Sequence, residues 1–194
     1  MVAESLQDKP ATAASAAAIQ AVWDLLEHIP DPEIPVVSIR ELGVLRDVRL
    51  VDGGMVEVVI TPTYSGCPAI GQIEDDIRTA LGQAGYAAKV STQLAPAWTT
   101  DWMDEATRNK LKDYGIAPPQ HQEAGIYVIK FATKSGVNYA DNARPGGPFG
   151  LTSVPCPQCG SQNTTETSHF ASTACKALYK CLDCLEPFDY FKPY

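Results

Sequence analysis

Residues 44–68, VLRDVRLVDGGMVEVVITPTYSGCP, contain the pattern that decides the fold of the first half of the chain. Two runs rich in β-branched residues, 44–51 and 55–61, flank an Asp-Gly-Gly sequence at 52–54. Because glycine readily adopts the positive φ angles of a tight turn, this pattern predicts a β-hairpin. The second strand leads into a Gly-Cys-Pro segment at 66–68, and its proline suits the start of a helix.

Helices and a third strand are predicted around the hairpin. Residues 16–29 carry apolar side chains at three- and four-residue spacing, which predicts a helix that the following prolines end. Residues 31–35, DPEIP, indicate a rigid, extended acidic loop. A second helix follows the hairpin, a third strand is expected at 86–94, and a last helix at 101–114 is opened by Asp101 as its cap.

The chain divides into a tail, two domains and a linker. Residues 1–15 are rich in small side chains and are expected to form a flexible tail, while residues 16–120 form the first domain. Residues 121–150 are rich in Pro and Gly, which predicts a linker with one short strand at Ile126–Phe131. Residues 151–194 form a second, smaller domain that holds five of the six cysteines.

Charge and composition exclude several classes of protein. The chain has a net charge of -8 and a pI of about 4.8, which suits phosphate backbones poorly and argues against a nucleic-acid partner. No apolar run approaches the roughly 18 residues of a membrane span, and the N-terminus lacks the features of a secretory signal. We therefore expect a cytoplasmic protein. In that reducing compartment, cysteines favour metal or thiol chemistry over disulfides.

Two CxxC pairs near the C-terminus predict a zinc ribbon. Cys156-Pro-Gln-Cys159 and Cys181-Leu-Asp-Cys184 are separated by 21 residues. Each pair can place two thiolates on one ion, and two pairs complete a tetrahedral shell. A closed shell of this kind favours structural zinc over catalysis. An iron or iron–sulfur site in the same four thiolates is the alternative.

The spacer between the CxxC pairs has room for a strand pair around 164–170 and 177–180, and it contains Cys175. The simpler interpretation of Cys175 is a small buried residue near the ribbon. The other interpretation is an accessory thiol that takes part in metal transfer or partner binding.

Cys67 lies at the predicted strand-to-helix junction. The first amides and the dipole of a helix stabilise anions there, and Gly66 leaves the sulfur accessible. A metal-binding or nucleophilic thiolate is one interpretation, and an inert buried cysteine is the other. Asp31 and Glu33 of the acidic loop are most simply solvated carboxylates. No histidine is tied to Cys67 as a base and no nucleotide-binding motif is present, so independent catalysis is weakly supported.

Several segments of residues 16–120 resemble the SufT-like iron–sulfur assembly domain family. These segments are Asp31-Pro32-Glu33-Ile34-Pro35, Glu41-Leu42-Gly43, Thr61-Pro62-Thr63, Gly66-Cys67-Pro68, PAWTTDWM at 96–103, and Gly115-Ile116-Ala117-Pro118-Pro119. The C-terminal segments resemble, in addition, the D-subunit family of the bacterial phenylacetyl-CoA epoxidase system. They are CPQCG at 156–160, STACK at 172–176 and CLDCLEPFDYF at 181–191.

The resemblance implies an α/β (α+β) fold, a small mixed sheet packed by helices, followed by a zinc ribbon. It also implies an accessory role in aerobic phenylacetate breakdown: a protein without turnover of its own would mature the iron or iron–sulfur centre of the epoxidase. Its partners would be the oxygenase or reductase subunits. Cys67 would transfer a transiently bound iron or cluster, with Asp31 and Glu33 nearby. A non-catalytic structural or regulatory subunit of the epoxidase is the alternative. The open edges of so short a sheet favour a homodimer.

Overall fold

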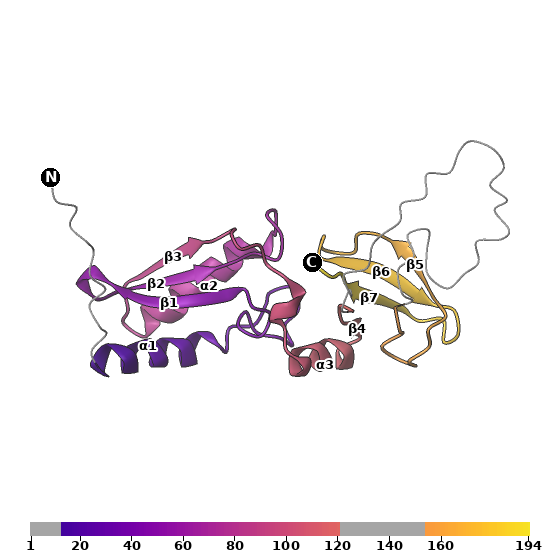
Figure 1. Ribbon diagram of the computed structural model, residues 1–194, viewed down its shortest axis with the longest axis horizontal. Coiled ribbons are helices and arrows are strands. Elements are labelled where there is room, and N and C mark those ends of the chain that lie inside the picture. Colours follow the sequence, from indigo (N-terminus) through magenta and orange to yellow (C-terminus); the bar gives the residue numbers. More distant parts are fainter. Residues whose placement is uncertain (1–12, 121–153) are drawn as a thin grey trace. The chain divides into compact units, whose positions relative to one another are not determined.

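The computed structural model describes residues 13–120 and 154–194, which divide into two compact units (Figure 1). The first unit contains the described residues up to Pro62 together with Pro68–Leu94. The second contains Thr63–Cys67 and the described residues from Ala95 onward. Among the described residues, no helix has the length and apolar character needed to cross a membrane.

The predicted hairpin is confirmed. β1 (Leu45–Val51) pairs antiparallel with β2 (Met55–Ile60) across a short 3₁₀ turn, η1 (Asp52–Gly54). Gly53 and Gly54 have φ angles of 80° and 77°, which a side chain at either position would strain. The Asp-Gly-Gly sequence therefore determines where the chain reverses.

A parallel third strand completes a mixed sheet of order β1-β2-β3. β3 (Ala88–Thr92) pairs with β2, with Val58 opposite Val90. One face of β2 is fully buried, whereas on the other face Glu57 forms an ion pair of 2.9 Å with Lys89. A sheet with one apolar and one charged face needs helices on the apolar face only. This mixed sheet packed by helices is the expected fold class.

Two helices cover this sheet. α1 (Ala13–Leu26) contacts β1, α2 (Ala69–Gln83) contacts β3, and the two helices contact each other. α1 begins three residues before the predicted start at residue 16 and ends three residues before the predicted end at residue 29. The alanines that were assigned to the tail extend the helix, because alanine has the highest helix propensity.

The segment after the first unit differs from its prediction. A 3₁₀ turn, η2 (Thr100–Trp102), precedes a shorter helix, α3 (Glu105–Asp113). The cap of α3 is Asp104, whose carboxylate accepts a hydrogen bond of 2.7 Å from the amide of Thr107. The prediction of Asp101 as the cap was therefore wrong by three residues.

The C-terminal sheet has four strands in the order β4-β7-β6-β5. β5 (Thr164–Ser168) and β6 (Lys176–Cys181) form the predicted pair, and β7 (Pro187–Phe191) adds to it antiparallel. β4 (Ile116–Ala117) pairs in parallel with β7. The sequence prediction had missed both β4 and β7.

Residues 95–120 belong to the second compact unit, which continues from Ala95. The end of the first domain at residue 120 stays a prediction. Two contacts tie residues 95–120 to the ribbon sheet. β4 joins the ribbon sheet, and the Trp98 ring lies 5.9 Å from Phe191 and 6.2 Å from Tyr194, measured between ring centroids. The predicted linker with its short strand, and residues 1–12 of the predicted tail, lie outside the described residues.

We predict that Asp104→Ala lowers the free energy of unfolding by about 1 kcal/mol, because the amide of Thr107 loses its acceptor. Asp104→Ser, which keeps an acceptor, should stay close to the parent. Hydrogen bonding with Thr107 lowers the pKa of Asp104, so the contribution of the cap should be lost as the pH falls through that pKa. Urea unfolding followed by tryptophan fluorescence measures this change. Equal stability of the alanine and serine variants would contradict it.

Candidate functional sites

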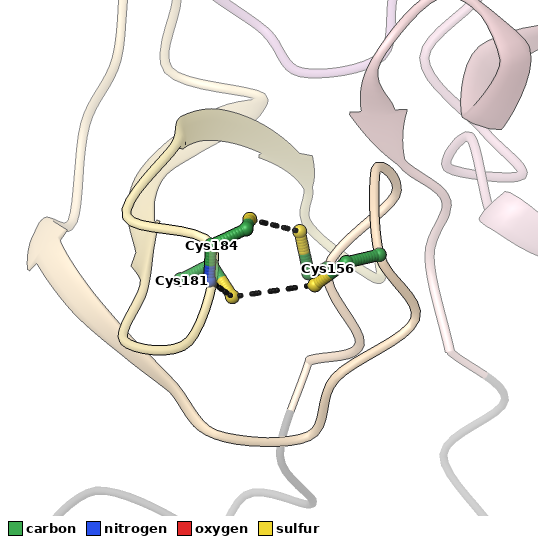
Figure 2. Close-up of side chains that lie close together, drawn as sticks. Cys156, Cys181 and Cys184 are labelled. Atoms are coloured by element: carbon green, nitrogen blue, oxygen red, sulfur yellow. Dashed lines mark hydrogen bonds between the residues drawn. The ribbon is translucent and has the colours of Figure 1, made fainter.

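Four cysteine thiols converge in the ribbon. Their sulfur atoms all lie within 4.8 Å of one another, and in Figure 2 the labelled side chains point toward a common centre. Cys156 Sγ lies 3.7 Å from Cys184 Sγ, and Cys159 Sγ lies 3.6 Å from Cys181 Sγ. A tetrahedral zinc ion with Zn–S bonds of about 2.3 Å would place its ligands about 3.8 Å apart. The separations therefore fit a four-thiolate zinc site.

Backbone turns position these sulfurs. The residue after the second cysteine of each pair has a positive φ angle, 74° at Gly160 and 67° at Leu185. In the first turn, the amide of Gly160 donates to the carbonyl of Cys156 at 2.9 Å. Positive φ is easy for glycine but costs an ordinary side chain energy. In the second turn, Leu185 adopts a positive φ angle in spite of this cost, and its side chain is 63% exposed.

Amide hydrogen bonds favour the thiolate form of Cys181. The amide of Cys184 lies 3.5 Å from Cys181 Sγ. This hydrogen bond, helped by a second one from the amide of Asp183, lowers the pKa of Cys181 to about 7. A low pKa suits a metal ligand, because the metal binds the deprotonated sulfur.

A polar bridge that the sequence did not reveal joins the two cysteine turns. The Asp183 carboxylate accepts hydrogen bonds from the Ser161 hydroxyl and from the side-chain amide of Asn163, the latter at 2.7 Å. These two hydrogen bonds lower the pKa of Asp183. Only the folded ribbon places these residues together, and nothing in their spacing predicts it.

Cys67 lies directly before α2, as predicted. Its amide donates to the carbonyl of Tyr64 at 3.1 Å, which closes a tight turn, and the residue is partly exposed. The loop Thr63–Cys67 belongs to the second compact unit, although the chain on both sides of it belongs to the first. A partly exposed sulfur can meet a solvent-borne metal or a partner protein.

The acidic loop is folded into turns and is not extended, which corrects the sequence prediction. Asp31 is 7% exposed, and its Oδ1 accepts hydrogen bonds of 2.9 Å from the amides of both Glu33 and Ile34. The Glu33 side chain is exposed. Asp31 thus shapes the loop, while Glu33 projects into solvent. Their relation to Cys67 stays a prediction, because the acidic loop and Cys67 belong to different units.

Cys175 is buried at 7% exposure, and its Sγ lies 3.1 Å from the Thr173 hydroxyl. It does not belong to the ribbon cluster, which is the one group of three or more potential ligands found among the described residues. Its burial agrees with the simpler interpretation of Cys175 as a small buried residue near the ribbon.

Comparison with known proteins finds two matching families. Residues 19–92 match the family described as "Iron-sulfur cluster assembly protein", and residues 143–192 match the "PaaD zinc beta ribbon domain". The first match contains the three-stranded sheet, and the second contains β5, β6 and β7 of the four-stranded sheet.

The chain is also similar to individual known proteins. The chain is 44% identical over 175 residues to a protein of Escherichia coli (strain K12) described as the putative D subunit of 1,2-phenylacetyl-CoA epoxidase, covering 90% of this chain and 92% of that protein. It is 33% identical over 93 residues to the "Fe-S protein maturation auxiliary factor YitW" of Bacillus subtilis (strain 168), covering 48% of this chain and 84% of that one. The solved structure of "Domain of Unknown Function DUF59" from Bacillus anthracis is 27% identical, with a TM-score of 0.47, covering 50% of this chain and 94% of that chain. The chain therefore belongs to the PaaD family, in which an iron–sulfur cluster assembly domain precedes a zinc ribbon.

Proposed function

We propose that this protein is a cytoplasmic maturation factor for the phenylacetyl-CoA 1,2-epoxidase of aerobic phenylacetate breakdown. It would supply iron or an iron–sulfur cluster to the oxygenase or reductase subunit and would have no turnover of its own. The observation that carries the proposal is the pairing of an iron–sulfur assembly domain with a partly exposed cysteine at the start of α2, in a chain similar along most of its length to an epoxidase D subunit.

Cys67 is the proposed transfer ligand. A carrier must bind its metal and then release it, so its ligands must be few and accessible. Cys67 precedes the 15-residue helix α2 by two residues, and a thiolate close to a helix N-terminus can be stabilised by the helix dipole. Glu33, which is exposed, is retained as a predicted metal-transfer residue, and Asp31 would act by holding the shape of its loop.

The ribbon cysteines are proposed to hold structural zinc. Cys156, Cys159, Cys181 and Cys184 would together complete a closed shell, which leaves no position for a substrate. Zinc would also compensate the negative charge of four adjacent thiolates. The ribbon therefore contributes folding energy, and Cys67 contributes the exchange of metal.

A stable structural or regulatory subunit of the epoxidase is the second candidate. The ribbon favours it through three exposed apolar side chains, Phe170 at 61%, Leu182 at 47% and Leu185 at 63%. Side chains of this kind suit a protein interface. A homodimer would form through β1 or β3, which are both edge strands.

The first prediction concerns Cys67. Oxygenase and reductase subunits are produced with the parent protein, with Cys67→Ser, and without either, and iron and acid-labile sulfide are then measured in each purified subunit. We expect one client to lose most of its metal in the last two cases. Full loading of every client in all three cases would instead support the structural-subunit candidate. The zinc content of Cys67→Ser should equal that of the parent, since the ribbon is intact.

The second prediction concerns the ribbon. Cys184→Ser should reduce bound zinc from one ion per chain and lower the free energy of unfolding of the second unit by at least about 3 kcal/mol, because metal binding supplies folding energy. Zinc affinity in the parent should fall as the pH is lowered, since protons compete for the thiolates. Metal analysis and thermal unfolding measure both effects. A Cys184→Ser variant with undiminished zinc would show that the cluster is not the site.

The third prediction separates shape from charge at Asp31. Asp31→Ala should destabilise the first unit by about 2 kcal/mol, because two amides lose a charged acceptor. Asp31→Asn keeps an acceptor and should retain most of that stability. If the asparagine variant still loads the client as well as the parent does, Asp31 acts through the loop. If loading falls while stability holds, the carboxylate itself takes part in transfer.

A further inference from the structure

The exposed side of the cysteine cluster contains one cysteine from each CxxC turn. Cys159 and Cys184 are exposed, whereas Cys156 and Cys181 are buried. An ion inside a closed shell of four thiolates leaves only after one thiolate detaches and water or a competing ligand takes its place. An exposed thiolate is the easier one to replace, so we expect loss of the ion to begin at Cys159 or Cys184.

The polar bridge lies directly beside both of these cysteines. Ser161 follows Cys159 by two residues, and Asp183 immediately precedes Cys184. The Asp183 carboxylate accepts a hydrogen bond from the Ser161 hydroxyl, and it accepts a second one, at 2.7 Å, from the side-chain amide of Asn163. One carboxylate of the second turn therefore holds two side chains that follow the first turn.

The hydrogen bonds of the bridge support one another. The backbone amide of Asn163 donates to the Ser161 hydroxyl oxygen at 3.0 Å, which leaves the hydroxyl hydrogen for Asp183. The backbone amide of Leu182 donates to the carbonyl of Asn163 at 2.8 Å, and the amide of Cys156 donates to the carbonyl of Ser161 at 2.9 Å. The segment after the first turn is thus connected to both turns through its backbone, and the Asp183 carboxylate adds the side-chain connection.

The bridge opposes separation of the two turns. Cys156 Sγ lies 3.7 Å from Cys184 Sγ, and Cys159 Sγ lies 3.6 Å from Cys181 Sγ, so each of these pairs takes one sulfur from each turn. A thiolate detaches from an ion between the turns more easily when its turn can move away from the other. Groups outside the ligand shell that orient metal ligands typically change metal affinity by about 10–100-fold.

We propose that Asp183 is a positioning residue of the ribbon, and that its bridge to Ser161 and Asn163 retains zinc by slowing the detachment of the exposed thiolates. The inference rests on the proposed zinc site of the ribbon and does not depend on metal transfer by Cys67. It goes beyond the proposed function, because it names the contact that lets one chain keep zinc while it passes another metal to a partner.

Release of zinc from the full chain tests the proposal. The zinc-loaded protein is mixed with an excess of the chromogenic chelator pyridylazoresorcinol, and the first-order rate of zinc release is measured. Asp183→Ala should release zinc about 10–100 times faster than the parent. Asp183→Asn, which can still accept a hydrogen bond from Asn163, should lie between the two. Equal rates in the parent and in Asp183→Ala would overturn the proposal.

Two matched variants control for charge and for general stability. Glu186→Gln removes another exposed carboxylate close to Cys184 in the chain. Asp104→Ala removes the cap of α3, which belongs to the same compact unit but not to the bridge. Both should release zinc at the rate of the parent. If either control accelerates release as much as Asp183→Ala does, charge or general stability explains the effect and the proposal is wrong.

A double-mutant cycle isolates the bridge itself. Asn163→Ala should accelerate release, and its combination with Asp183→Ala should be no faster than Asp183→Ala alone, because the Asn163 side chain acts through that carboxylate. Additive effects would contradict the bridge. With Co²⁺ in place of zinc, each variant should keep the absorption of four thiolate ligands, since all four cysteines remain. A lower number of sulfur ligands in Asp183→Ala would contradict a positioning role.

The outcomes also separate this inference from the proposed zinc site. A parent protein that binds no zinc would overturn both. If the parent binds zinc but releases it at the same rate with and without the Asp183 carboxylate, the zinc site stands and the role of Asp183 is wrong.

Discussion

The convergence of four cysteine sulfurs within 4.8 Å is the constraint on which the C-terminal half of the molecule depends. Four thiols at this distance cannot all ionise without a cation among them, because like charges repel strongly when they are partly removed from water. Meeting this constraint requires a sharp turn after β6, which in turn allows β7 to pair back on it. β4 pairs with the other edge of β7. The resulting sheet is large enough to bury Tyr179, Phe188 and Tyr190.

The pairing of β4 with β7 has consequences beyond the ribbon. Residues 95–120, which include Trp98 and α3, belong to the second unit. The loop of Cys67 belongs to the same unit, while α2, which follows it directly in the chain, belongs to the first. The proposed transfer cysteine therefore lies where the chain passes from one unit to the other. Its backbone is tied to the start of a helix, and its neighbours along the loop pack within the unit of the ribbon.

Two kinds of sulfur chemistry can coexist in one chain because their surroundings differ. The ribbon cysteines are held by backbone turns and by the Asp183 bridge, which leave little freedom for exchange. Cys67 lies outside that set of four, and it is partly exposed. A ligand set that is complete in the folded protein retains its ion, whereas an incomplete set can pass the ion to a partner that supplies the remaining ligands. Under the proposed function, the fold would separate a structural task of the ribbon from an exchange task of Cys67.

The sequence by itself determined the features that depend on neighbouring residues. These are the hairpin around Gly53 and Gly54, the CxxC pairs, and the position of Cys67 before α2, because turn conformation, ligand spacing and helix starts are local properties. Only the tertiary structure decided the partner of β4, the cap of α3, the burial of Asp31 and the neighbourhood of Cys175. From the local sequence alone, Asp101 and Asp104 are equally good helix caps. A carboxylate beside a proline, such as that of Asp31, is equally plausible in solvent and in the protein interior. Each choice depends on contacts between segments far apart in the chain, and local sequence patterns carry no record of those contacts.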